Sequence, residues 1–237
     1  MFSAIYAGIP ITTEIELGTN YTITVDSITG YYGTLSRSYI ARYQNVNNVI
    51  FQYAQSGIYV LSTDGYFVTA DNWNTDREDA VGVAVMASNH AFVVSLEKYY
   101  GCVSSDKWSS PCSGAIAITD LNTAKQRFSG ASDTTLMINT YGAGSDTAQG
   151  IANAYQFKNG KKGYLPSMGE LNIMFNNVSA VDACLSKIKN GQTISNDDLW
   201  SSTYYGLYGN VYCFWSLVGA TYRYANTGRN LKVVYSL

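Results

Sequence analysis

The sequence predicts an α+β fold, because three kinds of local pattern follow one another along its 237 residues. Short β-branched and aromatic runs come first, helix-capping signals appear only in the middle, and β-type runs return after Trp200. Hydrophobic residues make up 46% of the chain, which is enough for a folded core. We therefore expect a small β-rich N-terminal domain over residues 1–78 and a second domain over residues 79–237.

The β-type runs of the first part predict five short strands, over residues 21–26, 38–44, 48–54, 58–62 and 66–70. Asp64-Gly65 separates the last two and is a tight-hairpin signal. Two apolar strands, 81–87 and 91–96, follow and are joined by a turn at Ser88-Asn89-His90.

Helix signals predict four helices, over residues 119–128, 146–157, 167–177 and 178–189. The third begins with a capping box formed by Ser167 and Glu170. The fourth ends in lysines, which the helix dipole favours. From Trp200 onward the pattern is again β, through to the last residues NLKVVYSL.

The composition is polar, aromatic and weakly charged, with 21 Tyr, 21 Gly, only 3 Pro and 14% charged residues. Such a composition suits recognition surfaces on sheets and loops better than a helical bundle. A net charge of -2 without a basic run argues against a nucleic-acid partner. No apolar run is long enough to insert into a membrane, and the N-terminal residues do not read as a secretion signal.

The four cysteines, at positions 102, 112, 184 and 213, form no CxxC pair and have no histidine at ligand spacing. We expect no zinc site, and neither GAGS nor GKKG has the context of a phosphate-binding loop, so no metal or cofactor is expected. Cys102 and Cys112 flank a loop that a disulfide would close, but free buried thiols are equally ordinary. Both alternatives stay open at this point.

Catalytic groups are scarce in the sequence, so we expect the protein not to be an enzyme. The single histidine, His90, lies in an expected turn between apolar strands, and its neighbours Asn89 and Ala91 resemble no known catalytic setting. Glu170 is better explained as a helix cap than as an acid. Asp197 and Asp198 are better explained as a loop or helix start, although paired carboxylates are what glycoside hydrolysis needs.

Three tracts in a fixed order carry a family resemblance: GVAV to AFVVSL (82–96), GYLPSMGELN (163–172) and LWSST (199–203). They resemble the C-type-lectin-fold variable proteins diversified by retroelements, found at phage tail-fibre tips and on bacterial surfaces, especially those of gut Bacteroidetes and their phages. The resemblance covers about residues 80–237, and STDGYFVTADNW (62–73) is similar to the segment that precedes this domain. It implies a C-type lectin-like fold of the formylglycine-generating-enzyme-like variant.

The sequence departs from the family's calcium-binding lectins and from its enzymes. Glu-Pro-Asn or Gln-Pro-Asp loops with a Trp-Asn-Asp strand are missing, which disfavours calcium-dependent sugar binding. The enzymatic relatives need a cysteine pair or three histidines, and this chain has one histidine and an isolated Cys213. The resemblance therefore implies binding rather than catalysis.

In this family an error-prone reverse transcriptase turns AAY codons into NNY, which cannot encode Lys, Glu, Gln, Met or Trp. From Tyr204 to Asn230 the one residue of this excluded set is Trp215. The resemblance thus implies a variable region over about residues 200–237, with Trp215 as part of the scaffold.

Strand alternation extends this interpretation to individual residues. If Trp215 is buried, Val211, Cys213 and Leu217 face the core with it, and the opposite parity faces a ligand. The predicted ligand-binding residues are Tyr204, Tyr205, Leu207, Tyr208, Asn210, Tyr212, Phe214, Ser216, Tyr222, Arg223, Tyr224, Asn226, Arg229 and Asn230.

The resemblance implies a non-enzymatic protein that binds a protein or glycan receptor on a cell surface. It would be displayed as a homo-trimer on a virion, at a tail-fibre tip, or on a bacterial cell surface. Two alternatives remain: a fixed-specificity adhesin or structural tip subunit whose tyrosines pave an interface, and a carbohydrate-active enzyme that uses Asp197, Asp198 or Glu170.

Overall fold

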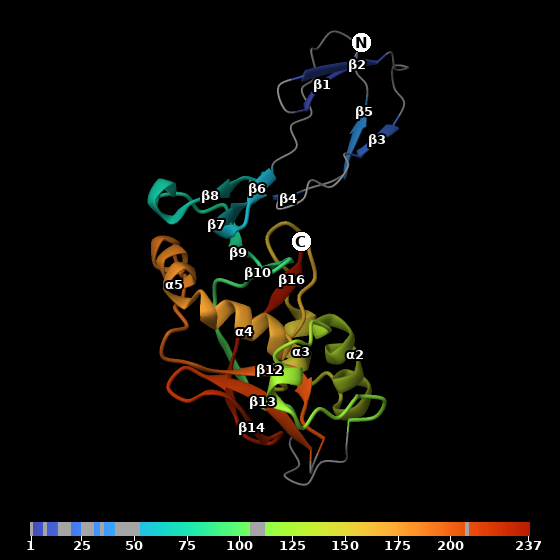
Figure 1. Ribbon diagram of the computed structural model, residues 1–237, viewed down its shortest axis with the longest axis vertical. Coiled ribbons are helices and arrows are strands. Elements are labelled where there is room, and N and C mark those ends of the chain that lie inside the picture. Colours follow the sequence, from blue (N-terminus) through green and yellow to red (C-terminus); the bar gives the residue numbers. More distant parts are fainter. Residues whose placement is uncertain are drawn as a thin grey trace. The chain divides into compact units, whose positions relative to one another are not determined.

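The computed structural model describes residues 2–6, 9–13, 20–24, 31–33, 36–40, 53–104, 112–206 and 209–237. Contacts divide the chain into two compact units, residues 1–56 with Leu237 and residues 57–236. Helices and antiparallel-rich sheets occur together in the second unit, as an α+β fold requires (Figure 1).

The described part of the first unit consists of antiparallel strand pairs. The pairs are β1 (Phe2–Tyr6) with β2 (Ile9–Thr13), β3 (Asn20–Thr24) with β5 (Ser36–Ile40), and β4 (Tyr31–Gly33) with β6 (Tyr53–Gln55). The β-rich character predicted for this region is therefore present. Most of the strand predicted over 48–54 lies outside the described residues.

A five-stranded sheet opens the second unit, in the order β16-β10-β9-β7-β8. Its strands are β7 (Gly57–Ser62), β8 (Phe67–Val68), β9 (Ala80–Ala87), β10 (His90–Val94) and the last strand of the chain, β16 (Val234–Ser236). β7 pairs with β9 along its whole length, so residues 57–78 belong to this unit. The boundary thus lies at Ser56, earlier than the sequence indicated, because the 58–70 hairpin completes this sheet instead of a separate β domain.

The second sheet has the order β11-β15-β12-β13-β14. Its strands are β11 (Tyr99–Gly101), β12 (Asp198–Tyr204), β13 (Asn210–Trp215), β14 (Gly219–Tyr224) and β15 (Arg229–Leu231). β12 and β15 run parallel, and the other neighbours are antiparallel. β14 ends the order and has β13 as its one strand neighbour among the described residues.

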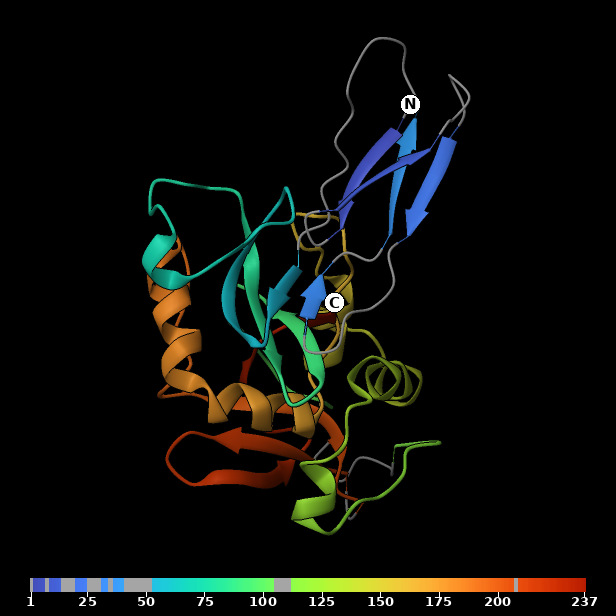
Figure 2. The ribbon, with the colours of Figure 1, turned by 45° about the horizontal axis from the view of Figure 1, so that its top comes forward.

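The helices come between the two sheets in the sequence: η1 (Ala70–Asn72), α1 (Leu121–Ala124), α2 (Gly130–Tyr141), α3 (Ala148–Ala154), α4 (Met168–Asn176) and α5 (Val178–Lys187). Figures 1 and 2 show α4 lying between the strands of the first sheet and the β12–β14 strands of the second. Ser167 and Glu170 form the predicted capping box at its start. Buried side chains on both sides of α4 form a core, and the second sheet packs against it.

The α2 helix was not predicted, because its first residues, GASD, show no apolar periodicity. The start of this helix is held instead by a contact with the preceding loop. Arg127 Nε donates to Asp133 Oδ2 at 2.7 Å, and Ser129 Oγ donates to the same oxygen at 2.6 Å.

The link from β15 to β16 carries the chain from the second sheet back to the first. It contains Lys232, which is fully buried and whose Nζ donates to the carbonyls of Ser95 and Leu96 at 3.0 and 2.7 Å. The next residue, Val233, exchanges hydrogen bonds with Ser95. These contacts join the two sheets through one short buried segment.

Candidate functional site

The β13–β14 hairpin presents the most exposed apolar residues among those that the structure describes in the predicted variable region. Its turn is closed by a hydrogen bond from the Val218 amide to the Trp215 carbonyl at 3.0 Å, and Gly219 supplies the positive φ of 86° that the turn needs. Leu217 and Val218 at the tip are 78% and 64% exposed. The prediction that Leu217 faces the core is therefore wrong, because residues 216–218 form the turn and not the end of a strand.

β13 is buried on both faces along most of its length. Val211 and Cys213 lie in the core as predicted, but Asn210 and Tyr212 of the opposite parity are buried as well, with Tyr212 only 1% exposed. Tyr204 on β12 is also buried. Tyr204, Asn210 and Tyr212 therefore do not lie at the surface of this structure.

Helix α4 is one reason for this burial. The Phe214 ring stacks on Phe175 of α4 at 4.1 Å between ring centroids, with 7° between the ring planes. Phe214 is consequently half-buried, and so are Trp215 and Ser216. The face of β13 that was expected to meet a ligand meets this helix instead.

Three tyrosines form a cluster over the other end of β13. Tyr205 and Tyr222 stack on each other at 3.9 Å, with 15° between their rings, and both meet the buried Tyr212 edge-on at 5.6 and 6.5 Å. Burial raises the pKa of Tyr212 to about 12, whereas a hydrogen bond with Tyr222 is the main cause of the raised pKa of Tyr205. Tyr212 thus supports a pair of tyrosines that lie nearer the surface.

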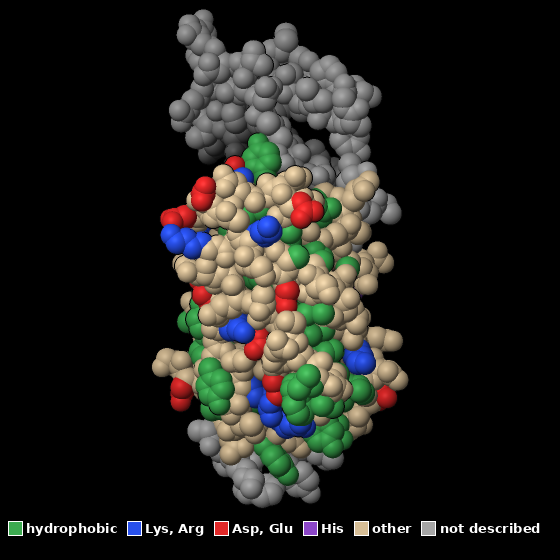
Figure 3. All heavy atoms as spheres, turned by 90° about the vertical axis from the view of Figure 1, so that its left-hand side faces the viewer, with side chains coloured by type: hydrophobic (Ala, Val, Ile, Leu, Met, Phe, Trp, Pro, Cys, Tyr) green, Lys and Arg blue, Asp and Glu red, His purple; other side chains and the backbone are tan. Residues whose placement is uncertain are grey.

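β14 carries the exposed members of the predicted set. Tyr222 and Tyr224 are 44% and 40% exposed, and Asn226 follows them at the surface. Figure 3 looks onto the face that is on the left of Figure 1 and shows separate hydrophobic side chains around a few charged ones at its lower end. We call Tyr205, Tyr222, Tyr224 and Asn226 the β14 surface.

Arg223, Arg229 and Asn230, the predicted polar ligand contacts at and beyond β14, have different hydrogen-bond and ion-pair partners. Arg223 Nη1 donates to the carbonyl oxygen of Tyr222 at 2.9 Å and to Thr221 Oγ1 at 3.0 Å. Arg229 forms an ion pair with Asp198, and Asn230 donates to Asp197 Oδ1 at 2.9 Å. Arg229 and Asn230 therefore hold the start of β12, while Arg223 stays on the edge strand. Leu207 and Tyr208 lie outside the described residues.

The carboxylates considered for catalysis do not converge on an open site. Asp197 is held by Lys98 at 2.8 Å and by Asn230, and Asp198 by Arg229. Glu170 is buried, accepts from Tyr164 Oη at 2.7 Å and from the Ser167 amide, and has a pKa raised chiefly by burial.

The structure also describes the surroundings of His90, the state of the cysteines and the character of the helices. His90 stacks on Phe128 at 3.4 Å, and burial lowers its pKa. All four cysteines are free thiols, so of the two alternatives for Cys102 and Cys112 the structure has the unbridged one. No helix in the described ranges has the length and apolar character needed to span a membrane.

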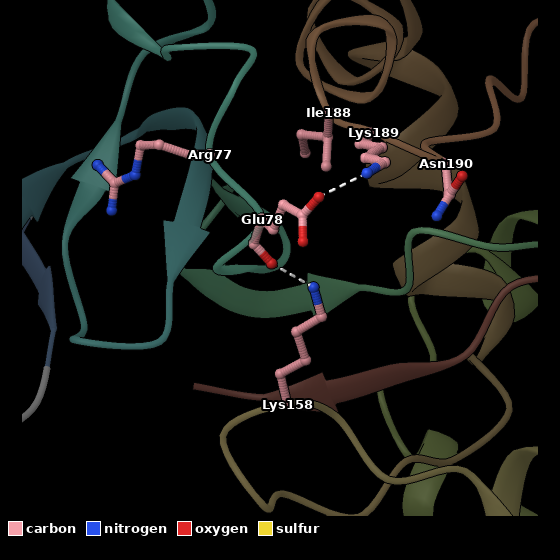
Figure 4. A pocket seen from close by; sticks show the side chains of 6 residues that line it. All are labelled: Arg77, Glu78, Lys158, Ile188, Lys189 and Asn190. Carbon is pink, nitrogen blue, oxygen red and sulfur yellow. Dashed lines mark hydrogen bonds and ion pairs between the residues drawn. The ribbon is translucent and has the colours of Figure 1, made fainter.

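A shallow polar hollow lies elsewhere in the second unit (Figure 4). It is lined by Arg77, Glu78, Lys158, Ile188, Lys189 and Asn190. Glu78 occupies both lysines: its carbonyl accepts from Lys158 Nζ at 2.5 Å and its carboxylate pairs with Lys189. Arg77 is paired with Asp79, so two of the three cations that line this hollow have a carboxylate partner.

The exposed hairpin tip at Leu217 and Val218 was not predicted from the sequence. Its signal is present in the sequence, since SLVG between two aromatic runs ends in a glycine that can take positive φ. Treating these residues as a turn would have placed Leu217 and Val218 at the surface.

Comparison with known proteins gives one structural likeness and no family. No family model matches the chain, and no curated protein matches it either. A solved structure, a fimbrial protein from Bacteroides ovatus ATCC 8483, is similar with a TM-score of 0.55 and 13% sequence identity. The likeness covers 85% of this chain but only 55% of that protein, so the chain spans about half of its length. At this identity the likeness shows the fold alone, and the α+β architecture is one that a Bacteroides fimbrial protein also adopts.

Proposed function

We propose that this chain is a non-enzymatic ligand-binding protein of a bacterial cell surface, with the β14 surface as its contact region. One observation carries the proposal: Tyr222 and Tyr224 project from a sheet whose inner strand is fully anchored, next to the stacked Tyr205. Tyrosines on a rigid frame bury a large area at little entropic cost, which is how protein-binding paratopes work. The likeness to a fimbrial protein supports a surface adhesin and favours a cell surface over a phage tail fibre.

The absence of enzymatic activity is part of the proposal. Asp197, Asp198 and Glu170 each have a structural partner, and the first two also fix the position of β15. Paired carboxylates that hydrolyse a glycoside must instead face a substrate across a cleft. The third alternative, a carbohydrate-active enzyme, is therefore the least supported.

At the finer level we propose a C-type lectin-like domain for the second unit. Its support is that two of the tracts on which the resemblance rests meet in space. The Ser202 amide donates to the Pro166 carbonyl at 2.8 Å, and the Met168 amide donates to Thr203 Oγ1 at 2.9 Å. The LPSMGEL and WSST tracts thus form one joint between the start of α4 and strand β12.

Diversification by a retroelement is the other finer part of the proposal, with a fixed-specificity adhesin as its alternative. The β14 surface fits it, because each of its four residues can be encoded by an NNY codon and none is needed in the core. Sequencing the DNA downstream of the gene tests it. We expect a near-duplicate repeat with adenines at the codons for Tyr222, Tyr224 and Asn226, and a locus without such a repeat would leave the fixed adhesin.

The binding role is tested by a matched pair of variants of the full chain. Tyr66 is 41% exposed and lies outside the β14 surface, so Tyr66→Ser removes as much exposed tyrosine as a change on β14. Fluorescently labelled protein would be titrated onto a panel of bacterial and host cells. We expect the Tyr222→Ser/Tyr224→Ser double variant to bind at least tenfold more weakly, with Tyr66→Ser unchanged. Equal binding by all three proteins would overturn the proposal, and size-exclusion chromatography of each would test the proposed homo-trimer.

A further inference from the structure

Among the described residues, strand β14 has no strand on its outer edge, and Arg223 lies beside that edge. The strand ends the order of the second sheet, and it contains neither proline nor lysine, the residues that commonly protect such edges. In an antiparallel pair, every second residue turns its N–H and C=O groups away from the neighbouring strand. Such groups are a template on which another strand can form hydrogen bonds.

The hydrogen bonds of β13 identify which residues of β14 point outward. The Tyr212 carbonyl accepts from Ser201 Oγ of β12 at 2.8 Å and so turns away from β14, which means that Tyr222, its register partner, turns its own N–H and C=O groups outward. With a period of two, Ala220 is another. The Tyr224 carbonyl already accepts from the Thr227 amide at 3.0 Å, which ends the open stretch. The available edge therefore runs from Ala220 to Tyr222, and Arg223 covers one of its carbonyls.

The charges around this edge indicate what kind of strand it accepts. The sequence contains no Asp or Glu after Asp198. Of the three cations in that stretch, Arg229 is paired with Asp198 and Lys232 is buried against backbone carbonyls. Within the described ranges no carboxylate pairs with Arg223, which lies on β14 beside two exposed tyrosines. A carboxylate on a partner would form a charge-assisted hydrogen bond with this guanidinium.

We propose that β14 is a strand-addition site for an extended, acidic segment of a partner protein. Resting on the proposed function, this names the class of partner that the β14 surface takes. The added strand would pair with the backbone of Ala220 and Tyr222, and its acidic side chain would draw Arg223 off the Tyr222 carbonyl. Tyr222 and Tyr224 would then flank the added strand and select its side chains. In the free protein Arg223 donates to the Tyr222 carbonyl at this edge. In the complex it would bind the carboxylate of the partner instead.

A displayed library of random peptides, each about twelve residues long, tests this with the full chain as bait. We expect enriched peptides with β-branched residues around an Asp or Glu. Ala220→Pro removes an outward N–H without removing a side-chain contact, and proline is tolerated on edge strands. It should weaken binding of the selected peptides roughly tenfold or more. Changing the acidic residue of the peptide to its amide should cost a similar factor against the native chain and little against Arg223→Gln, with Arg77→Gln as the matched surface control.

The outcomes separate this inference from the proposed function. Peptides that bind Ala220→Pro as tightly as the native chain, yet lose affinity on Tyr222→Ser, would leave the binding surface standing and refute strand addition. Peptides insensitive to both changes, or a library that yields no binder, would count against both. If Ala220→Pro fails to fold, amide hydrogen exchange of the native chain decides instead. Strand addition requires slower exchange at Ala220 and Tyr222 when the peptide is bound, and unchanged exchange would refute it.

Discussion

Neighbouring strands of one hairpin, β13 and β14, have nearly opposite environments. On β13, Val211, Tyr212 and Cys213 are all buried, whichever way they point, whereas β14 exposes Tyr222 and Tyr224 and has no second strand neighbour in the described part of the chain. The alternation of side chains along a strand is therefore not enough to say which aromatic residues reach the surface. The position of the strand within the sheet also decides it. β13 lies inside the sheet and under α4, while β14 ends the sheet.

The largest expected effect comes from moving the same substitution from one strand to the other. Tyr212→Ala should lower the free energy of unfolding by about 3–5 kcal/mol, because a fully buried aromatic ring leaves a cavity. Tyr222→Ala should cost less than about 1 kcal/mol, since the ring is exposed on one side. Urea denaturation followed by tryptophan fluorescence measures both. Similar losses for the two variants would show that the strands do not differ as described.

Removing the contact between β13 and α4 should have the next largest effect. Phe214→Ala loses the stacked ring of Phe175 and is expected to cost about 1–3 kcal/mol, less than Tyr212→Ala because Phe214 is only half-buried. A double-mutant cycle with Phe175→Ala isolates the pair, and we expect a coupling of about 0.5–1.5 kcal/mol. A coupling near zero would mean that α4 does not cover this face of β13.

The pH dependence of stability should differ between a buried cation, Lys232, and a cation on the edge strand, Arg223. Burial lowers the pKa of Lys232 to about 7 in the folded state, below its unfolded value, so the unfolded chain binds more protons above that pH. This residue should make stability rise with pH from about 7 toward 10, by at most about 1.4 kcal/mol per pH unit.

Lys232→Met should abolish that contribution, measured as the difference between its urea midpoints and those of the native chain across the range. Arg223→Gln is the matched change at the edge and should leave the pH profile as it is. A Lys232→Met profile parallel to the native one would contradict the assignment.

The smallest effect on stability is expected at the hairpin tip. Leu217→Ser and Val218→Ser should change the free energy of unfolding by less than about 0.5 kcal/mol, because both side chains are already in water. Thermal unfolding of the double variant checks this. A large loss would place these residues in a buried contact and remove the tip from the exposed part of the hairpin.

Local patterns predicted much of this fold, and contacts distant in sequence explain the rest. The capping box at Ser167 and the strands around Val85 and Val211 follow from spacing and composition, and the structure confirms them. Strand alternation failed at Tyr212, since one face is covered by α4 and by Tyr205, which no local pattern encodes. Exposure on β14 was expected, but its cause, a position at the sheet edge, depends on a strand order that the sequence does not state.

Tyrosine nitration of the free and the cell-bound chain tests the central claim most directly, with modified residues identified by mass spectrometry. Tyr222, Tyr224 and Tyr66 should all react in the free protein, while the buried Tyr212 should not. When the chain is bound to the cells that retain it best, Tyr222 and Tyr224 should be protected and Tyr66 should react as before. Protection of Tyr66 with continued reaction of Tyr222 and Tyr224 would contradict the claim that β14 is the contact surface.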